Sequence, residues 1–296
     1  MSCRSLIKDW LPPRILKWAR SFFGNSLRFS GQLHNWTEAR EMSTGYDDNN
    51  ILIRVAATTR QVLKGQAKYE RDSVAFNEID YSFPLVTSLL YAASMNNGRL
   101  DVIDFGGSLG STYRQCKPFF GGLKNIKWQV IEQTNFVDMG RNEFSTEELT
   151  FHNTIGQLEN IKGHKRILLL SSVLQYLESP LKILDEFKQL DLSHIIIDRT
   201  PISKSPDNSL CIQKVPKNIY DASYPCWILS EYKLLSNFSE HWDKFYEFPC
   251  LDGKWSTDDG LDFEYKGFLC HLFANQFLCP QHQKILMKPF WHALIQ

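Results

Sequence analysis

Short apolar runs alternate with amphipathic stretches through the middle of the chain. The spacing between the runs predicts helices at 112–120, 135–144 and 181–190. Strands that alternate with helices form a parallel sheet covered on both faces. We therefore expect an α/β fold with a doubly wound, mostly parallel, Rossmann-like sheet. Its predicted strands are LDVIDF (100–105), KWQVIEQ (127–133), LTFHN (149–153), RILLLSS (166–172) and HIIIDRT (194–200).

The first 98 residues divide into two parts. Residues 1–30 mix tryptophans and phenylalanines with lysines and arginines, and after Pro13 the pattern predicts a basic amphipathic helix. Such a helix could lie on an anionic membrane surface through residues 6–23, or pack on the domain or on a partner. Both interpretations stay open. Residues 31–98 carry helical spacing with glycine stops and predict a helical N-terminal extension.

Residues 99–275 form the main domain, with one insertion and a terminal hairpin. Residues 200–227 predict a loop-rich insertion. Two late apolar runs, near 243–249 and 265–273, predict strands that pair as an antiparallel hairpin. The last residues, 276–296, follow as a C-terminal tail.

Composition narrows the classes of protein that fit. Lys and Arg together number 33, as do Asp and Glu, so no net field attracts nucleic acid. The seven cysteines include no CxxC pair, which argues against a disulfide framework and a structural zinc site and favours a reducing cytosol. No apolar run reaches the length that spans a bilayer, and no clustered carboxylates indicate a metal. We expect a cytoplasmic protein whose N-terminal segment could contact the inner face of the membrane.

A glycine-rich turn follows the first strand of the sheet. Asp104, Gly106 and Gly110 stand in a D-x-G-x-x-x-G pattern, with Gly107 and Ser108 inside it. Glycine lets the chain turn sharply and lets a ligand touch the backbone, at the edge where open α/β sheets bind nucleotides. The dinucleotide frame G-x-G-x-x-G matches only at its first glycine, whereas acid-x-G-x-G-x-G fails only at Ser108. A tight turn without a ligand is the alternative.

Glu132 closes the second strand and supports the nucleotide interpretation. A carboxylate at that strand end can accept hydrogen bonds from both ribose hydroxyls. The glycine turn and this acid together are a stronger signal than either alone. They predict a nucleoside-containing ligand across the first two strands.

Residues 100–200 resemble class I S-adenosylmethionine-dependent methyltransferases. The chain is also similar to a poorly characterised bacterial methyltransferase family that is associated with surface-polysaccharide gene clusters. This resemblance implies S-adenosylmethionine as cofactor and a small-molecule or glycan-precursor acceptor methylated on oxygen or nitrogen. The blocks that carry it are STGYD (43–47), YERDS (69–73), DFGGSLGSTY (104–113), SSVLQYLE (171–178), IIDRTP (196–201) and SYPCW (223–227).

The resemblance also implies which residues would hold the cofactor. The methionine part would lie on the glycine turn, the ribose on Glu132 and the adenine beside Gln133. The third strand ends without an acid, so Asn153 or Thr154 would contact the adenine amino group. The full set of expected cofactor-binding residues is Asp104, Gly106, Gly107, Ser108, Gly110, Glu132, Gln133, Asn153, Ser171 and Ser172.

The acceptor and catalytic residues are expected at the ends of the fourth and fifth strands. Asp198 could remove a proton from a hydroxyl acceptor, and Arg199 could bind an anionic acceptor or form a structural ion pair with the acid. His152 has a suitable pKa for a base, although a lone histidine beside a strand is more often structural. The residues expected to contact the acceptor are Gln175, Tyr176, Arg199, Tyr224 and Trp227.

Three further hypotheses come from the same residues. Glu70, Arg71 and Asp72 could form a lid over the cofactor, or only a solvated charge cluster or helix cap. A methyltransferase fold that binds cofactor without turnover is one rival function. A nicotinamide-dependent oxidoreductase is the other, and the glycine frame fits it poorly.

Overall fold

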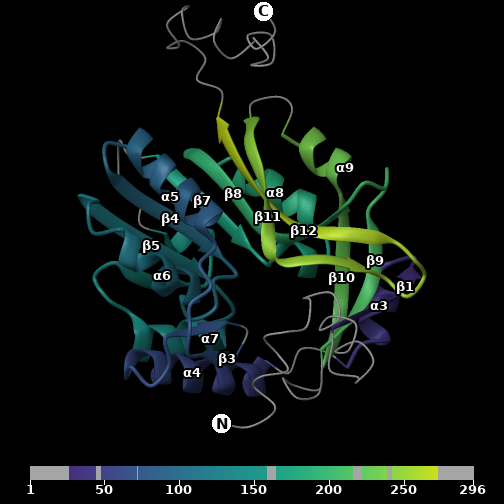
Figure 1. Ribbon diagram of the computed structural model, residues 1–296, viewed down its shortest axis with the longest axis horizontal. Coiled ribbons are helices and arrows are strands. Elements are labelled where there is room, and N and C mark those ends of the chain that lie inside the picture. Colours follow the sequence, from purple (N-terminus) through teal and green to yellow (C-terminus); the bar gives the residue numbers. More distant parts are fainter. Residues whose placement is uncertain are drawn as a thin grey trace, which may run out of the picture.

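A parallel sheet forms the centre of the molecule. The computed structural model describes residues 27–44, 48–71, 73–158, 165–215, 222–238 and 242–272. Five parallel strands lie side by side in the order β6-β5-β4-β7-β8, of which β5, β4, β7 and β8 are labelled in Figure 1. Their bounds are Arg99–Phe105 (β4), Asn125–Ile131 (β5), Leu149–His152 (β6), Arg166–Ser171 (β7) and Leu192–Ser203 (β8).

An antiparallel hairpin extends this sheet beyond β8. β12 (Asp262–Leu272) runs antiparallel to β8, and β11 (Trp242–Ser256) pairs with β12. The expected doubly wound, mostly parallel sheet with a terminal hairpin is therefore confirmed, although the hairpin strands are longer than the sequence predicts.

Helices cover both faces of the sheet. Side chains alternate between the two faces along each strand, so Val102 and Trp128 enter one apolar cluster, whereas Ile103 and Leu168 enter a second one. Helices α4, α5, α6 and α7 contribute to the first cluster, and α8 and α9 contribute to the second. The α-helices are Trp36–Glu41 (α3), Asp48–Leu63 (α4), Phe83–Met95 (α5), Ser111–Cys116 (α6), Thr134–Met139 (α7), Pro180–Phe187 (α8) and Glu231–Ser236 (α9). Short 3-10 turns lie at Lys117–Phe119, Ile155–Gln157 and Leu174–Tyr176, and a π-turn at Gly140–Phe144.

The same sheet continues past the end of β7 along the C-terminal part of β8. β8 pairs with β7 only as far as Asp198, and beyond that point β10 (Ser223–Ser230) runs parallel to it. β9 (Ser209–Lys214) and β1 (Arg28–Leu33) follow antiparallel, and Asp258 N donates to Phe29 O at 3.0 Å, which links β1 to the β11–β12 turn. These strands enclose their own apolar cluster.

The prediction of a loop-rich insertion at 200–227 is wrong. Most of its described residues belong to β8, β9 and β10. Proline, serine and cysteine in these strands weaken the apolar signal, and pairing with β1 supplies what local preference does not. The expected helical extension at 31–98 also contains strands, since β1 reaches Leu33 and a hairpin forms from β2 (Tyr69–Arg71) and β3 (Val74–Phe76).

Several expectations concern residues outside the described part of the chain. The basic amphipathic helix and its contact through 6–23 lie there, as does the tail at 276–296. Among the residues that the structure describes, no helix combines the length and the apolar character needed to cross a bilayer.

Candidate functional site

Residues with left-handed backbone conformations lie after two neighbouring strands and within a third. Gly106 follows β4 with φ of +74°, Ser172 follows β7 with +55°, and Arg199 lies in β8 with +51°. A serine or arginine in this region costs free energy, and such residues gather at functional sites. The Ser172 N–H donates to the Asp198 carbonyl at 2.9 Å, so the β7 and β8 ends are tied together.

The glycine turn after β4 allows no side chains at its first two positions. A Cβ on Gly106 would lie 2.6 Å from Val173 Cγ2, and one on Gly107 would overlap the carboxyl group of Asp104. The Gly106 N–H donates to the Ile131 carbonyl at 2.9 Å, which joins the turn to the end of β5. The backbone of this turn therefore packs closely on its neighbours.

Asp104 lies beneath this turn. Its side chain is almost fully buried and accepts a hydrogen bond from Trp128 Nε1 at 2.8 Å. Burial raises the pKa of Asp104 to about 7, with the Trp128 hydrogen bond acting against the rise and the charge of Glu132 adding to it. A nearby cation would favour the ionised carboxylate.

Glu132 reaches from the end of β5 to the same turn. Its Oε1 accepts the Ser108 N–H at 3.2 Å, and its Oε2 accepts the Gln133 N–H at 2.8 Å. The carboxylate thus bridges the glycine turn and the first turn of α7. Gln133 is exposed beside it.

The end of β6 lies further along the same edge. Asn153 donates from Nδ2 to Thr134 Oγ1 at 3.4 Å, which places its side chain beside the start of α7. His152 Nε2 lies 2.9 Å from Thr150 Oγ1 on the same strand. Because β5 and β4 separate β6 from β7, the structure does not bring His152 together with Asp198.

A pocket opens at the ends of β7 and β8. It is lined by Ser171 and Asp198 at these strand ends, by Thr112 of α6 and by Arg71 of the β2–β3 hairpin. The bulge in β11 completes it with Asp252. The pocket is therefore polar and mixed in charge.

Asp198 is held in this pocket without direct access to bulk solvent. It is 1% exposed, and it accepts from Ser171 Oγ at 2.8 Å and from Cys250 Sγ at 3.4 Å. Burial raises the pKa of Asp198, although Arg199 and Ser171 act in the opposite direction. A carboxylate with a raised pKa is a suitable proton acceptor near neutral pH.

Arg199 is already paired, so its predicted contact with an anionic acceptor is not supported by this geometry. Its Nε and Nη2 atoms donate to Asp252 at 3.1 and 3.3 Å. Burial by itself would raise the pKa of Asp252, but the charges of Arg199 and Arg71 hold the pKa below its ordinary value. The predicted structural ion pair therefore exists, but Asp252 rather than Asp198 is the partner.

A bulge in β11 explains why Asp252 reaches Arg199. Pro249 pairs with Lys266 and Lys254 with Glu264, so β11 has extra residues between two positions of β12. Such a bulge redirects side chains. It places Cys250 Sγ 3.2 Å from the Arg199 backbone nitrogen. No local sequence signal marks Cys250 or Asp252 as site residues.

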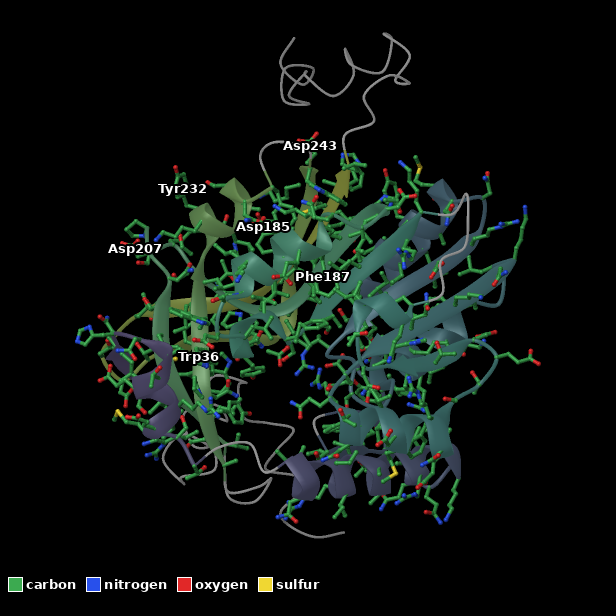
Figure 2. All side chains as sticks on the ribbon, turned by 180° about the vertical axis from the view of Figure 1, so that it is seen from behind. Trp36, Asp185, Phe187, Asp207, Tyr232 and Asp243 are labelled. Carbon is green, nitrogen blue, oxygen red and sulfur yellow. The ribbon has the colours of Figure 1, made fainter. Side chains whose placement is uncertain are left out.

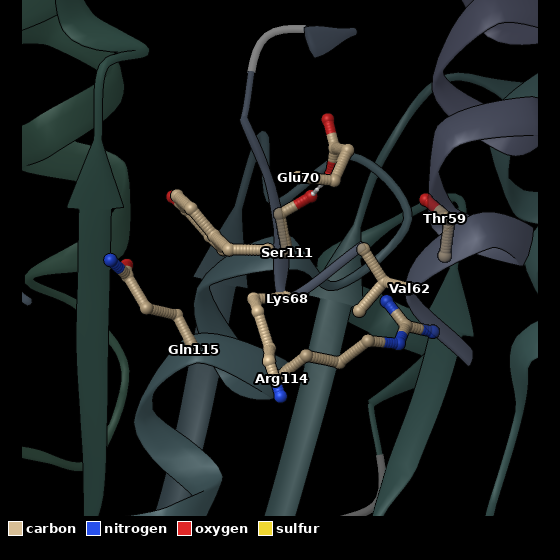
Figure 3. A pocket seen from close by; sticks show the side chains of 8 residues that line it. Thr59, Val62, Lys68, Glu70, Ser111, Arg114 and Gln115 are labelled. Atoms are coloured by element: carbon tan, nitrogen blue, oxygen red, sulfur yellow. Dashed lines mark hydrogen bonds between the residues drawn. The ribbon is translucent and has the colours of Figure 1, made fainter. Parts of the chain in front are cut away.

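The β2–β3 hairpin is tied to the helix that follows the glycine turn. Ser111 Oγ donates to Glu70, and Figure 3 shows these two side chains facing each other. Glu70 is 4% exposed and also accepts the Ser73 N–H at 3.2 Å. Glu70, Ser111 and Arg114 line a second pocket, which lies between the hairpin and α6. Burial lowers the pKa of Arg114 to about 10. The YERDS block was the signal for Glu70, whereas Ser111 and Arg114 were missed. Asp72 lies outside the described residues.

Gln175 contacts the residues that follow β7 and lie within β8. Its side chain is fully buried, and Nε2 donates to Ser172 Oγ at 3.1 Å and to the Arg199 carbonyl at 3.3 Å. The expected direct contact with an acceptor is therefore corrected: Gln175 holds the two left-handed residues in place.

Three predicted acceptor-side aromatic residues do not share one pocket. Tyr176 donates from Oη to Gln213 at 3.1 Å, and its ring meets that of Tyr224 edge-on at 5.1 Å. Trp227 stacks on Trp36 of α3 instead, at 6.1 Å between ring centroids; Trp36 is labelled in Figure 2. Tyr224 and Trp227 are an odd number of residues apart on β10, so they point to opposite faces. An acceptor pocket that contains both is therefore wrong.

Among the described residues, no three histidine, cysteine, aspartate or glutamate side chains are arranged to hold a metal ion.

Among known proteins, only solved structures are similar to this chain. No protein-family model and no curated protein match the sequence. The chain is similar to the N-terminal domain of EvdMO1, crystallised in the presence of SAH and D-fucose, with 11% identity over 77% of this chain and 97% of that one and a TM-score of 0.44. It is also similar to an S-adenosylmethionine-dependent methyltransferase from Clostridium acetobutylicum, with 12% identity over 73% and 97% and a TM-score of 0.41. The N-methyltransferase NodS from Bradyrhizobium japonicum, in complex with SAH, gives 13% identity over 74% and 98% and a TM-score of 0.40. Likenesses at these identities and scores assign no function to this chain.

Proposed function

We propose that the protein is an S-adenosylmethionine-dependent methyltransferase that acts on a small molecule. One observation carries the proposal: carboxylates surround the glycine turn. Asp104 lies beneath it, Glu132 accepts one of its N–H groups, and Glu70 accepts from Ser111 directly after it. S-adenosylmethionine carries a sulfonium and an ammonium group, and both are favoured beside such acids.

The same arrangement disfavours a dinucleotide. In a nicotinamide site the pyrophosphate lies on the first turn of the helix that follows the glycines. Here Ser111 opens that helix, and Glu70 lies against it. A second negative group at this position would be repelled, so a nicotinamide cofactor fits this site poorly.

The chain's own residues would divide the work as follows. Glu132 would accept hydrogen bonds from the ribose hydroxyls, and Asn153 and Gln133 would lie beside the adenine. The left-handed turn at Gly106 would let the methionine part approach the backbone. The cofactor, when bound, would supply an activated methyl group on sulfur.

Asp198 is the proposed proton acceptor. A hydroxyl oxygen or amine nitrogen of the acceptor would form a bond to the methyl carbon while the carbon–sulfur bond breaks and S-adenosylhomocysteine leaves. The acceptor atom would lose a proton, and Asp198, which lines the pocket, would take it. Ser171 fixes the carboxylate by its hydrogen bond. The polar lining of the pocket suits a small hydroxylated acceptor, and we propose a sugar or glycan precursor.

Binding and turnover test the proposal separately. Calorimetry should show that the purified protein binds S-adenosylhomocysteine, with little or no heat from NADH. Release of S-adenosylhomocysteine from S-adenosylmethionine is then followed over a panel of neutral and acidic sugars and nucleotide sugars. Failure to bind S-adenosylhomocysteine would contradict the proposed cofactor; binding without release on any acceptor would favour a module without turnover.

Asp198→Asn probes the proton acceptor once an acceptor is found. We expect kcat to fall by about a hundredfold or more, with cofactor affinity unchanged, since general-base removal typically costs this much. Ser171→Ala is the matched neighbour, and its smaller loss would reflect only poorer positioning. An unchanged kcat for Asp198→Asn would show that another group takes the proton.

A further inference from the structure

Among the described residues, the side chain of Arg71 lines the pocket without an ion-pair partner. The residue ends β2, lines the pocket beside Asp252 and is partly buried. Within the described part of the chain its side chain has no hydrogen bond and no ion pair, although its charge contributes to lowering the pKa of Asp252. By contrast, the guanidinium group of Arg199 donates hydrogen bonds to Asp252.

The pocket lining contains two guanidinium groups, of Arg71 and Arg199, and two carboxylates, of Asp198 and Asp252. Asp252 forms an ion pair with Arg199, and Asp198 accepts hydrogen bonds from Ser171 and Cys250. Among the described residues, neither carboxylate forms an ion pair with Arg71. A partly desolvated guanidinium without a partner is costly, and it is satisfied best by a bidentate anion.

The position of Arg71 is fixed by its neighbours. Glu70, the preceding residue, is tied to Ser111 at the start of α6, and Tyr69 before it is buried. Thr112 and Gln115 of α6 line the same pocket as Arg71. The arginine is therefore held between the glycine turn and the ends of β7 and β8.

We propose that Arg71 is the carboxylate-binding residue of this site. The inference rests on the proposed function and deepens it. Two ligand groups supply a carboxylate here: the methionine part of the cofactor, whose ammonium would face the acids of the glycine turn, and an acidic group on the acceptor. Proximity to α6 and the glycine turn favours the cofactor's carboxylate.

Two nucleosides that differ in the amino-acid end separate these sources. S-adenosylhomocysteine carries the amino-acid carboxylate, and 5′-methylthioadenosine lacks the whole amino-acid end. For Arg71→Gln we expect about a tenfold to hundredfold loss of affinity for the first and an unchanged affinity for the second, measured by calorimetry. Arg71→Lys keeps the positive charge but not the two parallel N–H donors of the guanidinium group, and it should lose less affinity for S-adenosylhomocysteine. Lys64→Gln removes an exposed charge from the end of α4 and should change neither affinity.

The acceptor arm uses a carboxylated sugar and its neutral counterpart. Glucuronate and glucose are compared by saturation-transfer NMR in the presence of S-adenosylhomocysteine. If Arg71→Gln leaves S-adenosylhomocysteine affinity intact but removes a glucuronate signal that the unchanged protein gives, the acceptor supplies the carboxylate. The role of Arg71 is overturned if Arg71→Gln leaves the binding of both S-adenosylhomocysteine and glucuronate unchanged. It is also overturned if the variant loses affinity equally for S-adenosylhomocysteine and 5′-methylthioadenosine. If the unchanged protein binds neither nucleoside, the proposed function itself fails.

Discussion

The guanidinium group of Arg199 donates to both carboxylate oxygens of Asp252, from Nε at 3.1 Å and from Nη2 at 3.3 Å. Both side chains are about four-fifths buried, at 18% and 21% exposure, and Arg199 also has a left-handed backbone. The pair joins the bulge in β11 to the end of β8. It thereby forms one wall of the pocket that holds Asp198.

Breaking this pair should destabilise the fold more than removing it altogether. We expect Arg199→Met and Asp252→Leu each to lower the free energy of unfolding by about 1–3 kcal/mol, because each leaves a partly buried charge alone. The double variant should lose less than the sum of the two. Urea unfolding of all four proteins gives the coupling energy. Additive losses would show that the two charges do not interact.

Gly106→Ala should disturb both stability and cofactor binding. Alanine at φ of +74° is strained, and its Cβ would lie 2.6 Å from Val173. We expect a loss of about 1–3 kcal/mol in the free energy of unfolding, together with weaker binding of S-adenosylhomocysteine. Gly121→Ala is the matched control, since a Cβ there meets no atom within 4 Å. Equal effects of the two substitutions would contradict the close packing of the turn.

Glu132→Gln tests the ribose contact without changing the shape of the side chain. The amide can still accept from Ser108 N, but it loses the charge that strengthens hydrogen bonds from ribose hydroxyls. We expect S-adenosylhomocysteine to bind about 1–3 kcal/mol more weakly, as a calorimetric titration would measure. Glu147→Gln, exposed in the loop before β6, is the control. An unchanged affinity for Glu132→Gln would place the ribose elsewhere.

Asp104 predicts a pH dependence of stability. Burial raises its pKa to about 7 in the folded protein, from an ordinary value near 4. The unfolded chain therefore releases the proton first, and the stability of the unchanged protein should fall as the pH rises from about 4 to about 7 and level off above it.

Asp104→Asn removes this titration and keeps an oxygen for Trp128. Thermal unfolding between pH 4 and 8 should show the variant gaining stability relative to the unchanged protein up to about pH 7. Asp138→Asn, an exposed carboxylate on α7, is the control for loss of one charge. Parallel curves for Asp104→Asn and the unchanged protein would rule out the proposed buried titration.

The core of the fold was predictable because its signals are local. Apolar runs such as RILLLS and HIIID can only be buried on both faces, and the segments between them have helical spacing. β9 and β10 were missed for the opposite reason: their serines, cysteines and proline read as a loop until β1 and β8 pair with them.

For the site, the sequence by itself determined what lies within a few residues of a strand end. Asp104, the glycine turn, Glu132 and Asp198 could be placed on one edge, because parallel strands end on the same side of a sheet. The tertiary structure decided which of these groups meet. Asp252 reaches Arg199 from a bulge in a strand more than fifty positions later, and Arg71 lines the pocket from a hairpin that the Glu70–Ser111 hydrogen bond joins to α6. Such contacts depend on register and on long-range packing, which no local pattern of residues encodes.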